Sequence, residues 1–256
     1  MTEHIVWNHL RTRLDQWQGE GRAVRLWLRD DDAVHPTPQL DHLLDLTKVH
    51  AVPLTLAVIP EKTGASLAGR LAGEEQTEVA VHGWSHTNYA PPDHKKMELG
   101  THRPAQTVLN ELAAGFKTLK GLHGSHFVPL LVPPWNRIAP EVVVGAAELG
   151  FRACSTYGPE KPGPLPQINT HVDIMNWRSG GGGYTPERLV PSLIAALEQA
   201  LHQGSAVGVL THHLVHDDVA WTGLEQLMQV TANHPAVKWQ PVGQLMAELP
   251  SNTTAG

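Results

Sequence analysis

Short apolar runs alternate with amphipathic helical patterns along almost the whole chain, and this alternation limits the folds that the sequence can adopt. The apolar runs are continuous, which is typical of parallel strands covered on both faces. We expect strands at residues 23–28, 53–60, 77–83, 126–134, 151–156, 170–177 and 205–213. Helical patterns follow at residues 37–50, 65–71, 105–122, 139–150, 185–204 and 223–234, and residues 237–249 add a last strand and helix. Six or seven strand–helix units predict an α/β fold, and we favour a β/α barrel over a doubly wound sheet.

The chain has the length of one domain. Its 256 residues, 41% of them hydrophobic, are enough for one sizeable core, and barrels commonly reach this size. Neither a repeat nor a break in composition marks a boundary. We therefore expect a single domain over residues 1–256, with its core at about residues 23–249 and a polar tail at residues 251–256.

The charge and hydropathy of the chain argue against several classes of partner. The formal net charge is −6 and the basic residues are not clustered, so we expect no nucleic-acid partner. No apolar run reaches the roughly 18 residues of a membrane span, and the first residues lack the apolar segment of a signal peptide. We therefore expect a cytoplasmic protein with no membrane partner, and the oligomeric state stays open.

The single cysteine, Cys154, excludes an internal disulfide and a cysteine-based zinc site, and we expect it to be a buried thiol.

Polar residues collect where the predicted strands end. The segment "WLRDDD" ends the first strand with three aspartates, "VAVHGWSH" carries His82 and His86, and "VLTHH" ends with His212 and His213. In β/α folds the functional site lies at the carboxyl ends of the strands, so these groups would project from one rim. His82 and His86 are four residues apart, and one helical turn would place both rings on the same side. Two such histidines and a carboxylate from another strand make a good site for Zn²⁺ or another divalent first-row metal.

The three adjacent aspartates need a reason at the end of a strand that reads as buried. Adjacent strand residues point in opposite directions, so one carboxylate can bind a metal ion while its neighbour accepts a proton. A divalent cation would also offset the repulsion between the carboxylates. We expect Asp32 to stand apart from this pair, capping the next helix and facing water.

Five short motifs occur in one order between residues 28 and 212, namely "LRDDD", "HGWSH", "VPPWNR", "DIMNW" and "LTH". Together they resemble the motifs of the polysaccharide deacetylase (NodB-homology, carbohydrate esterase family 4-like) superfamily. The second motif matches in full, with a serine before its second histidine. The resemblance implies a distorted (β/α)7 barrel, which agrees with the alternation of strands and helices.

The resemblance also implies roles for individual residues. Asp30 would be the general base, and His212 would be the general acid. The metal ligands would be Asp31, His82 and His86, and Zn²⁺ is the ion that we expect. Contacts to the substrate are expected from residues of the third and fourth motifs, which are Pro134, Trp135, Arg137, Asp173 and Trp177.

The sequence departs from the family pattern at several positions. Asp32 replaces a glycine, and Asn176 replaces the aspartate that usually tunes the acid histidine. The arginine of the third motif is absent, and Arg137 is a nearby candidate to replace it. His213 competes with His212 for the role of the acid.

These parts predict a metal-dependent hydrolase that removes an N-acyl group, such as acetyl, or an O-acyl group from an amino sugar or polysaccharide. A bound metal can lower the pKa of its water to about 7 and polarise a carbonyl. Asp30 would take the proton of the attacking water, and His212 would protonate the departing amine. Trp135 has the ring needed to stack on a sugar face.

Two other functions stay open. One is a metal-dependent amide hydrolase or deformylase that acts on a small cytoplasmic substrate, because cell-wall deacetylases usually have to be exported. The other is a degenerate barrel that binds carbohydrate without catalysis, which the missing arginine and Asn176 would favour.

Overall fold

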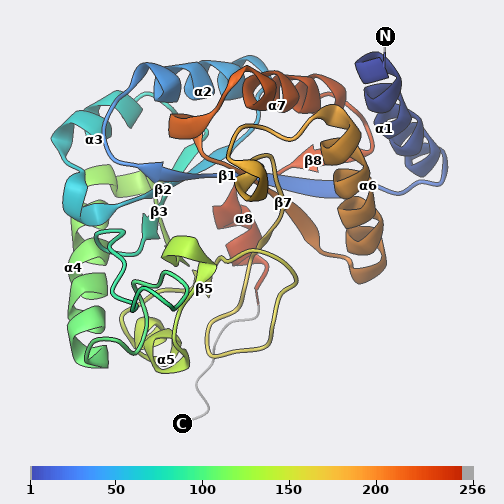
Figure 1. Ribbon diagram of the computed structural model, residues 1–256. Helices are drawn as coiled ribbons and strands as arrows, with labels where there is room; N and C mark the ends of the chain where they lie inside the picture. Colours follow the sequence, from blue (N-terminus) through green and yellow to red (C-terminus); the bar gives the residue numbers. More distant parts are fainter. Residues whose placement is uncertain (1, 250–256) are drawn as a thin grey trace.

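The strand β1 (Val24–Ala33) lies at the centre of a parallel sheet, and its neighbours build the barrel around it (Figure 1). The computed structural model of the protein describes residues 2–249, so the predicted tail at residues 251–256 lies outside the described residues. The strand order is β5–β4–β3–β2–β1–β7–β6, and β8 also pairs with β1. The other strands are β2 (Leu54–Val58), β3 (Thr77–His82), β4 (Phe127–Val132), β5 (Ala153–Cys154), β6 (Thr170–Asp173), β7 (Ala206–Thr211) and β8 (Val237–Trp239).

The sheet curls into a barrel that is incompletely closed. Its edge strands, β5 and β6, are linked through isolated parallel bridges from Cys154 to Gln167 and from Tyr157 to Thr170. Each pairing along the sheet is parallel, as the continuous apolar runs predicted. The structure thus confirms the predicted distorted (β/α)7 barrel.

Helices follow the strands and cover the outside of the barrel, as Figure 1 shows. They are α1 (Thr2–Gly19), α2 (Pro38–Val49), α3 (Ala65–Leu71), α4 (Ala105–His123), α5 (Pro140–Glu148), α6 (Pro186–Gln203), α7 (Asp218–Thr231) and α8 (Val242–Ala247). Short 3-10 helices are η1 (Pro60–Lys62), η2 (Gly124–His126), η3 (Pro134–Asn136), η4 (Trp177–Ser179) and η5 (His213–Val215). Among the described helices, none is long and apolar enough to cross a membrane.

The first helix, α1, adds to the core ahead of residue 23. It packs against α6 and α7, and Figure 1 shows it beside α6. Its buried side chains recur at spacings of three and four residues, which places them on one helix face; they are Trp7, Leu10, Leu14 and Trp17.

The amino-terminal end of the barrel is filled, which leaves the carboxyl end for a functional site. Val242, Leu245 and Met246 of α8 form a buried cluster with Trp27 and with small side chains from neighbouring strands. The backbone N–H of Gly243 donates to Glu78 near the start of β3, so α8 lies against the amino ends of the strands.

The structure corrects the predicted end of the first strand. β1 continues beyond Leu28 through all three aspartates, and Asp30 still pairs with Leu56 of β2 and Thr211 of β7. The register with β2 then shifts between Asp30 and Ala33, and Asp32 has a left-handed φ of 72°. Such an irregularity re-aims side chains at the end of a strand. The aspartates therefore belong to the strand itself and leave it in different directions.

Candidate active site

Two histidines from the end of β3 and the following loop face the last aspartate of β1. His82 Nε2 lies 3.1 Å from Asp32 Oδ1, and His86 Nε2 lies 3.4 Å from the same oxygen. The predicted helical turn between the histidines is wrong, because residues 83–86 form an irregular loop. Left-handed φ angles of 59° at Gly83 and 56° at His86 bring the two rings together in its place, with centroids 5.1 Å apart.

These three side chains suit a divalent metal ion. Their donor atoms all lie within 4.8 Å of one another. His82 Nδ1 lies 2.9 Å from the carbonyl of Val132, and a hydrogen bond there leaves Nε2 free to bind a cation. Burial raises the pKa of Asp32, but the hydrogen bond and the charge of His82 lower it by more, so this carboxyl is ionised. The sequence predicted Asp31 as the third ligand, but the carboxylate beside the histidines is that of Asp32. The irregularity at the end of β1 turns Asp32 toward them.

The prediction that Asp32 caps the next helix is also wrong. The helix α2 is capped by Thr37, whose side chain accepts a hydrogen bond from the backbone N–H of Leu40 at 3.0 Å. The carboxylate of Asp32 is therefore available to the histidines rather than to the helix.

Buried Glu98 holds the loop that carries His86. Its carboxylate accepts hydrogen bonds from the backbone N–H groups of Trp84 at 3.2 Å and Ser85 at 2.7 Å, and from the Ser85 hydroxyl at 2.9 Å. Glu98 is 1% exposed. No sequence motif indicates Glu98, because it lies in an irregular segment, twelve residues beyond His86 and outside every motif.

Replacing Glu98 with alanine is expected to weaken metal binding about 10–100-fold, because partners behind metal ligands orient those ligands. Competition between the protein and a chromophoric chelator for Zn²⁺ measures this loss. Glu111→Ala is the matched control, since Glu111 on α4 pairs with Arg103, which precedes the helix, and touches neither histidine. Equal metal affinities in the two variants would contradict the role of Glu98.

The middle aspartate, Asp31, pairs with a buried arginine of the same strand. Arg29 Nε lies 2.9 Å from Asp31 Oδ1, and Arg29 Nη2 donates to Asp31 Oδ2 at 3.0 Å. The same guanidinium donates to Ser155 Oγ at 2.7 Å and to Asn136 Oδ1 at 3.3 Å. The predicted substitute for the missing third-motif arginine was Arg137, but the arginine that the structure places on an aspartate of β1 is Arg29, which pairs with Asp31.

The first aspartate, Asp30, is enclosed in the protein and pairs with His213. The backbone N–H of His213 donates to Asp30 Oδ2 at 2.8 Å, the Thr211 hydroxyl donates to it at 2.9 Å, and the His213 ring contacts Oδ1. Burial raises the pKa of Asp30, but the charge and hydrogen bond of His213 outweigh burial and lower it. The structure therefore separates Asp30, the expected general base, and His213, the competing acid, from the cleft.

His212 faces the cleft between Asp31 and an aromatic wall. Its Nε2 lies 4.0 Å from Asp31 Oδ2, and its ring meets the edge of Trp177 at 4.8 Å between centroids. Trp177 Nε1 in turn donates to Asp173 at 2.9 Å. Burial raises the pKa of Asp173 and outweighs the charge of His212, which lowers it.

A further histidine, His216, holds the backbone of His212. The backbone N–H of His212 donates to His216 Nε2 at 3.2 Å, and Thr211 Oγ1 lies 2.8 Å from the same nitrogen. Burial lowers the pKa of His216 from 6.5 to about 4, against the charge of Asp30, which raises it. His216 is therefore neutral at pH 7.

Because His216 is neutral in the folded protein, we expect the free energy of unfolding to fall in acid. The unfolded chain takes up a proton at His216 near pH 6.5, whereas the folded protein does so only near pH 4, so protonation favours unfolding between these values. The share of His216 in this loss is about 3 kcal/mol. Urea unfolding between pH 4 and 7 should give a flatter profile for His216→Gln, which keeps an acceptor at this position. Parallel profiles for variant and wild type would contradict the shift.

The site opens into a cleft of about 920 Å³ at the carboxyl ends of the strands. Four of the five expected substrate-binding residues line this cleft, namely Trp135, Arg137, Asp173 and Trp177. Pro134 is buried and does not line it; a Cβ atom at Gly83 would lie 2.7 Å from its ring, so Pro134 packs under the histidine loop. The cleft also contains Lys96, Tyr157 and Tyr184, which the motifs did not indicate.

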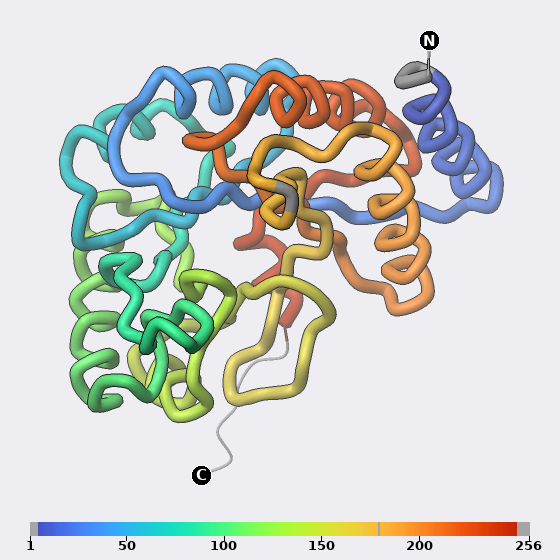
Figure 2. The backbone as a smooth tube through the Cα atoms, in the orientation of Figure 1, coloured from blue at the N-terminus to red at the C-terminus, as the bar shows by residue number. Residues whose placement is uncertain are grey.

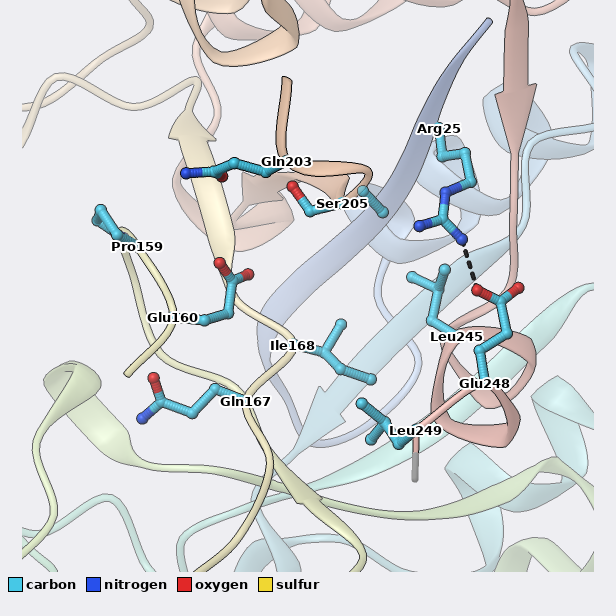
Figure 3. Close-up of a pocket in the computed structure, with 11 residues that line it drawn as sticks. Arg25, Pro159, Glu160, Gln167, Ile168, Gln203, Ser205, Leu245, Glu248 and Leu249 are labelled. Atoms are coloured by element: carbon cyan, nitrogen blue, oxygen red, sulfur yellow. Dashed lines mark hydrogen bonds and ion pairs between the residues drawn. The ribbon is translucent and has the colours of Figure 1, made fainter. Parts of the chain in front are cut away.

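A second, smaller cavity of about 480 Å³ lies at the other end of the barrel (Figure 3). Arg25 near the start of β1 and Ala206 at the start of β7 line it. Figure 3 shows the ion pair of Arg25 with Glu248 on its wall, and the two atoms are 2.5 Å apart. The histidines and aspartates of the candidate site are absent from its lining.

Solved structures share this fold at low sequence identity. A Mycobacterium smegmatis protein assigned to the polysaccharide deacetylases is 17% identical, covers 89% of this chain and 90% of its own, and has a TM-score of 0.69. An activity-restored mutant of a carbohydrate esterase family 4 pseudoenzyme is 17% identical, with 88% and 68% covered and a TM-score of 0.61. A family 4 acetyl xylan esterase from Clostridium thermocellum, bound to a cobalt ion, is 13% identical, with 87% and 90% covered and a TM-score of 0.57.

No protein-family model and no curated protein matches the sequence. At identities this low, a structural likeness shows the fold. The matched proteins nevertheless agree with one another, since each is a polysaccharide deacetylase or a member of carbohydrate esterase family 4. The chain therefore has the fold of the polysaccharide deacetylases of carbohydrate esterase family 4.

Proposed function

We propose that the protein is a metal-dependent deacylase that hydrolyses an N-acyl or O-acyl group on an amino sugar or polysaccharide. The observation that carries this proposal is the meeting of Asp32, His82 and His86 beside an arginine-held carboxylate, Asp31, at the floor of one cleft. The shared fold supports it, because the matched proteins include deacetylases and an acetyl xylan esterase.

The metal ion would be held by Asp32, His82 and His86. Two imidazoles and one carboxylate are a set of donors that suits zinc and other divalent first-row metals. The cobalt ion of the C. thermocellum esterase agrees with this class of metal. When bound, such an ion supplies polarisation of the acyl carbonyl and a lower pKa for water.

Asp31 would act as the general base in place of Asp30. It lies at the cleft, whereas Asp30 is enclosed by His213 and Thr211. Arg29 holds both oxygens of Asp31, which orients the carboxylate toward the cleft without a contribution from Arg137. The roles of base and metal ligand thus move by one residue along β1, and Ala33 takes the place of the glycine in the family motif.

His212 would act as the general acid. It is the cleft-facing histidine of the "LTH" motif, and its Nε2 lies 4.0 Å from Asp31 Oδ2. The base and the acid therefore flank one position, where Asp31 takes a proton from water and His212 gives one to the departing amine or alcohol. Trp135 and Trp177 provide the aromatic walls against which a sugar ring can stack.

Release of acetate or formate from soluble acylated substrates tests this function. The metal-depleted protein should be inactive, and activity should return with Zn²⁺ or Co²⁺. N-acetylglucosamine oligomers, acetylated xylan and small N-formyl or N-acetyl amides form the substrate series, so that a sugar deacylase is distinguished from a hydrolase of small amides. A metal-loaded protein that binds the oligomers and turns over no acyl group would instead support a carbohydrate-binding barrel.

A further inference from the structure

Three basic side chains line the cleft of a chain whose net charge is −6. They are Lys96 in the loop after β3, Arg137 directly after η3, and Arg178 in η4. Within residues 2–249, no carboxylate lies within 4.0 Å of any of the three. The cleft therefore carries positive charges that the protein itself does not neutralise.

The carboxylates of the cleft are each engaged elsewhere. Asp31 is paired with Arg29, and Asp32 faces the two histidines. Asp173 accepts from the Trp177 indole at 2.9 Å and from the Met175 backbone at 2.8 Å. A divalent ion among Asp32 and the histidines would add further positive charge, so the cleft is set to attract an anion.

Two of the basic residues belong to neighbouring segments of the cleft lining. Arg137 Nη1 donates to the carbonyl of Lys96 at 2.9 Å, and Leu99 forms a bridge with Ile138, so the two segments run side by side (Figure 2). This bond uses one of the five N–H groups of the guanidinium, which leaves others for a carboxylate or phosphate. Lys96 adds an ammonium group to the lining of the same cleft.

The ring of Trp135 lies close to both His86, a metal donor, and Lys96. Its ring centroid lies 4.4 Å from that of His86, and Lys96 Nζ lies 5.9 Å from the Trp135 centroid. A sugar ring bound beside Trp135 would therefore lie between the metal donors and Lys96, with its acyl group toward His86 and a second substituent toward Lys96 and Arg137.

We propose that the substrate is an anionic acylated sugar, whose carboxylate or phosphate is bound by Lys96 and Arg137 about one sugar ring away from the acyl group. This inference rests on the proposed function and adds the class of substrate to it. Arginine suits such a group because its planar fork binds two oxygens at once.

Three soluble sugars test the inference: neutral N-acetylglucosamine, its 6-phosphate, and N-acetylmuramic acid, which carries a carboxylate. We expect kcat/KM for at least one anionic sugar to exceed that of the neutral sugar about 10-fold or more, because charge-assisted hydrogen bonds are worth about 10–100-fold. Arg137→Gln and Lys96→Met should each reduce this preference about 10-fold, and Arg137→Lys should retain part of it. Lys117→Met, an exposed lysine of α4, should leave the preference unchanged.

Binding to a variant that cannot turn over separates this inference from the proposed function. Calorimetry with metal-loaded Asp31→Asn compares the three sugars directly, and the preference should again depend on Lys96 and Arg137. Equal affinity for neutral and anionic sugars, or a preference that survives both substitutions, would overturn the inference even if the protein proves to be a deacylase. Binding that prefers the anionic sugars in a protein with no acyl hydrolysis would overturn the proposed function alone.

Discussion

Three isosteric substitutions at adjacent positions of β1 should produce three different defects. Asp32→Asn is expected to lose the metal, and Asp30→Asn to lose stability with the metal retained. Asp31→Asn is expected to lose activity with the metal retained, together with some stability because buried Arg29 loses its anion. Each change removes one negative charge and keeps the size of the side chain. A purely electrostatic role for the aspartate run would instead give three similar variants.

The contacts of each carboxylate explain its expected defect. Asp32 is the aspartate that reaches His82 and His86, so its loss should weaken Zn²⁺ binding by more than about 100-fold. Asp31 lies at the cleft beside His212, and removal of a general base costs about 10²–10⁴-fold in kcat. Asp30 is enclosed with His213, and breaking a buried ion pair costs about 3–5 kcal/mol.

Metal content by atomic emission spectroscopy, acetate release and urea unfolding distinguish the three outcomes. The decisive comparison is metal content in Asp31→Asn and Asp32→Asn. Loss of metal in Asp31→Asn with full occupancy in Asp32→Asn would restore the ligand set expected from the sequence, and would contradict the shift of roles by one residue.

That shift shows where prediction from the sequence ends. The motifs placed aspartates and histidines at the carboxyl ends of neighbouring strands, and in the structure His82, His86 and an aspartate of β1 do meet there. Which aspartate meets the histidines depends on the length of β1 and on its irregular pairing with β2 after Asp30. These are properties of the sheet, and a run of three identical residues gives no local signal of them.

The motifs also did not indicate the residues that hold the site in place, for a related reason. Arg29 reaches Ser155 and Asn136, which are more than a hundred residues away, and Glu98 reaches back to Trp84 and Ser85 from an irregular loop. One signal was present for Arg29: it directly follows a predicted apolar strand, and an arginine that is buried must have a partner, because buried charges are paired. The adjacent aspartates were the nearest candidates for that partner.

Replacing Arg29 with methionine is expected to destabilise the protein by about 3–5 kcal/mol, because it leaves Asp31 buried without its cation. Arg29 is 0% exposed and Asp31 is 4% exposed, so little water can reach the lost contacts. The carbonyl of Ser155, which accepts from Arg29 Nη1 at 3.2 Å, would lose its partner too. Urea unfolding measures the loss, and the folded fraction should also show a lower kcat because Asp31 is no longer oriented.

Arg25→Met is the matched control for this prediction. Arg25 lies on the same strand, pairs with Glu248 at 2.5 Å and donates to the carbonyl of Gly204 at 2.7 Å, so both arginines bind one carboxylate and one carbonyl. The side chains of Arg25 and Glu248 are 30% and 47% exposed, and exposed pairs contribute about 1 kcal/mol or less. The double variant Arg29→Met with Asp31→Asn should recover part of the loss, since it removes the unpaired charge. A loss in Arg29→Met no larger than in Arg25→Met would show that the buried pair does not hold the base in place.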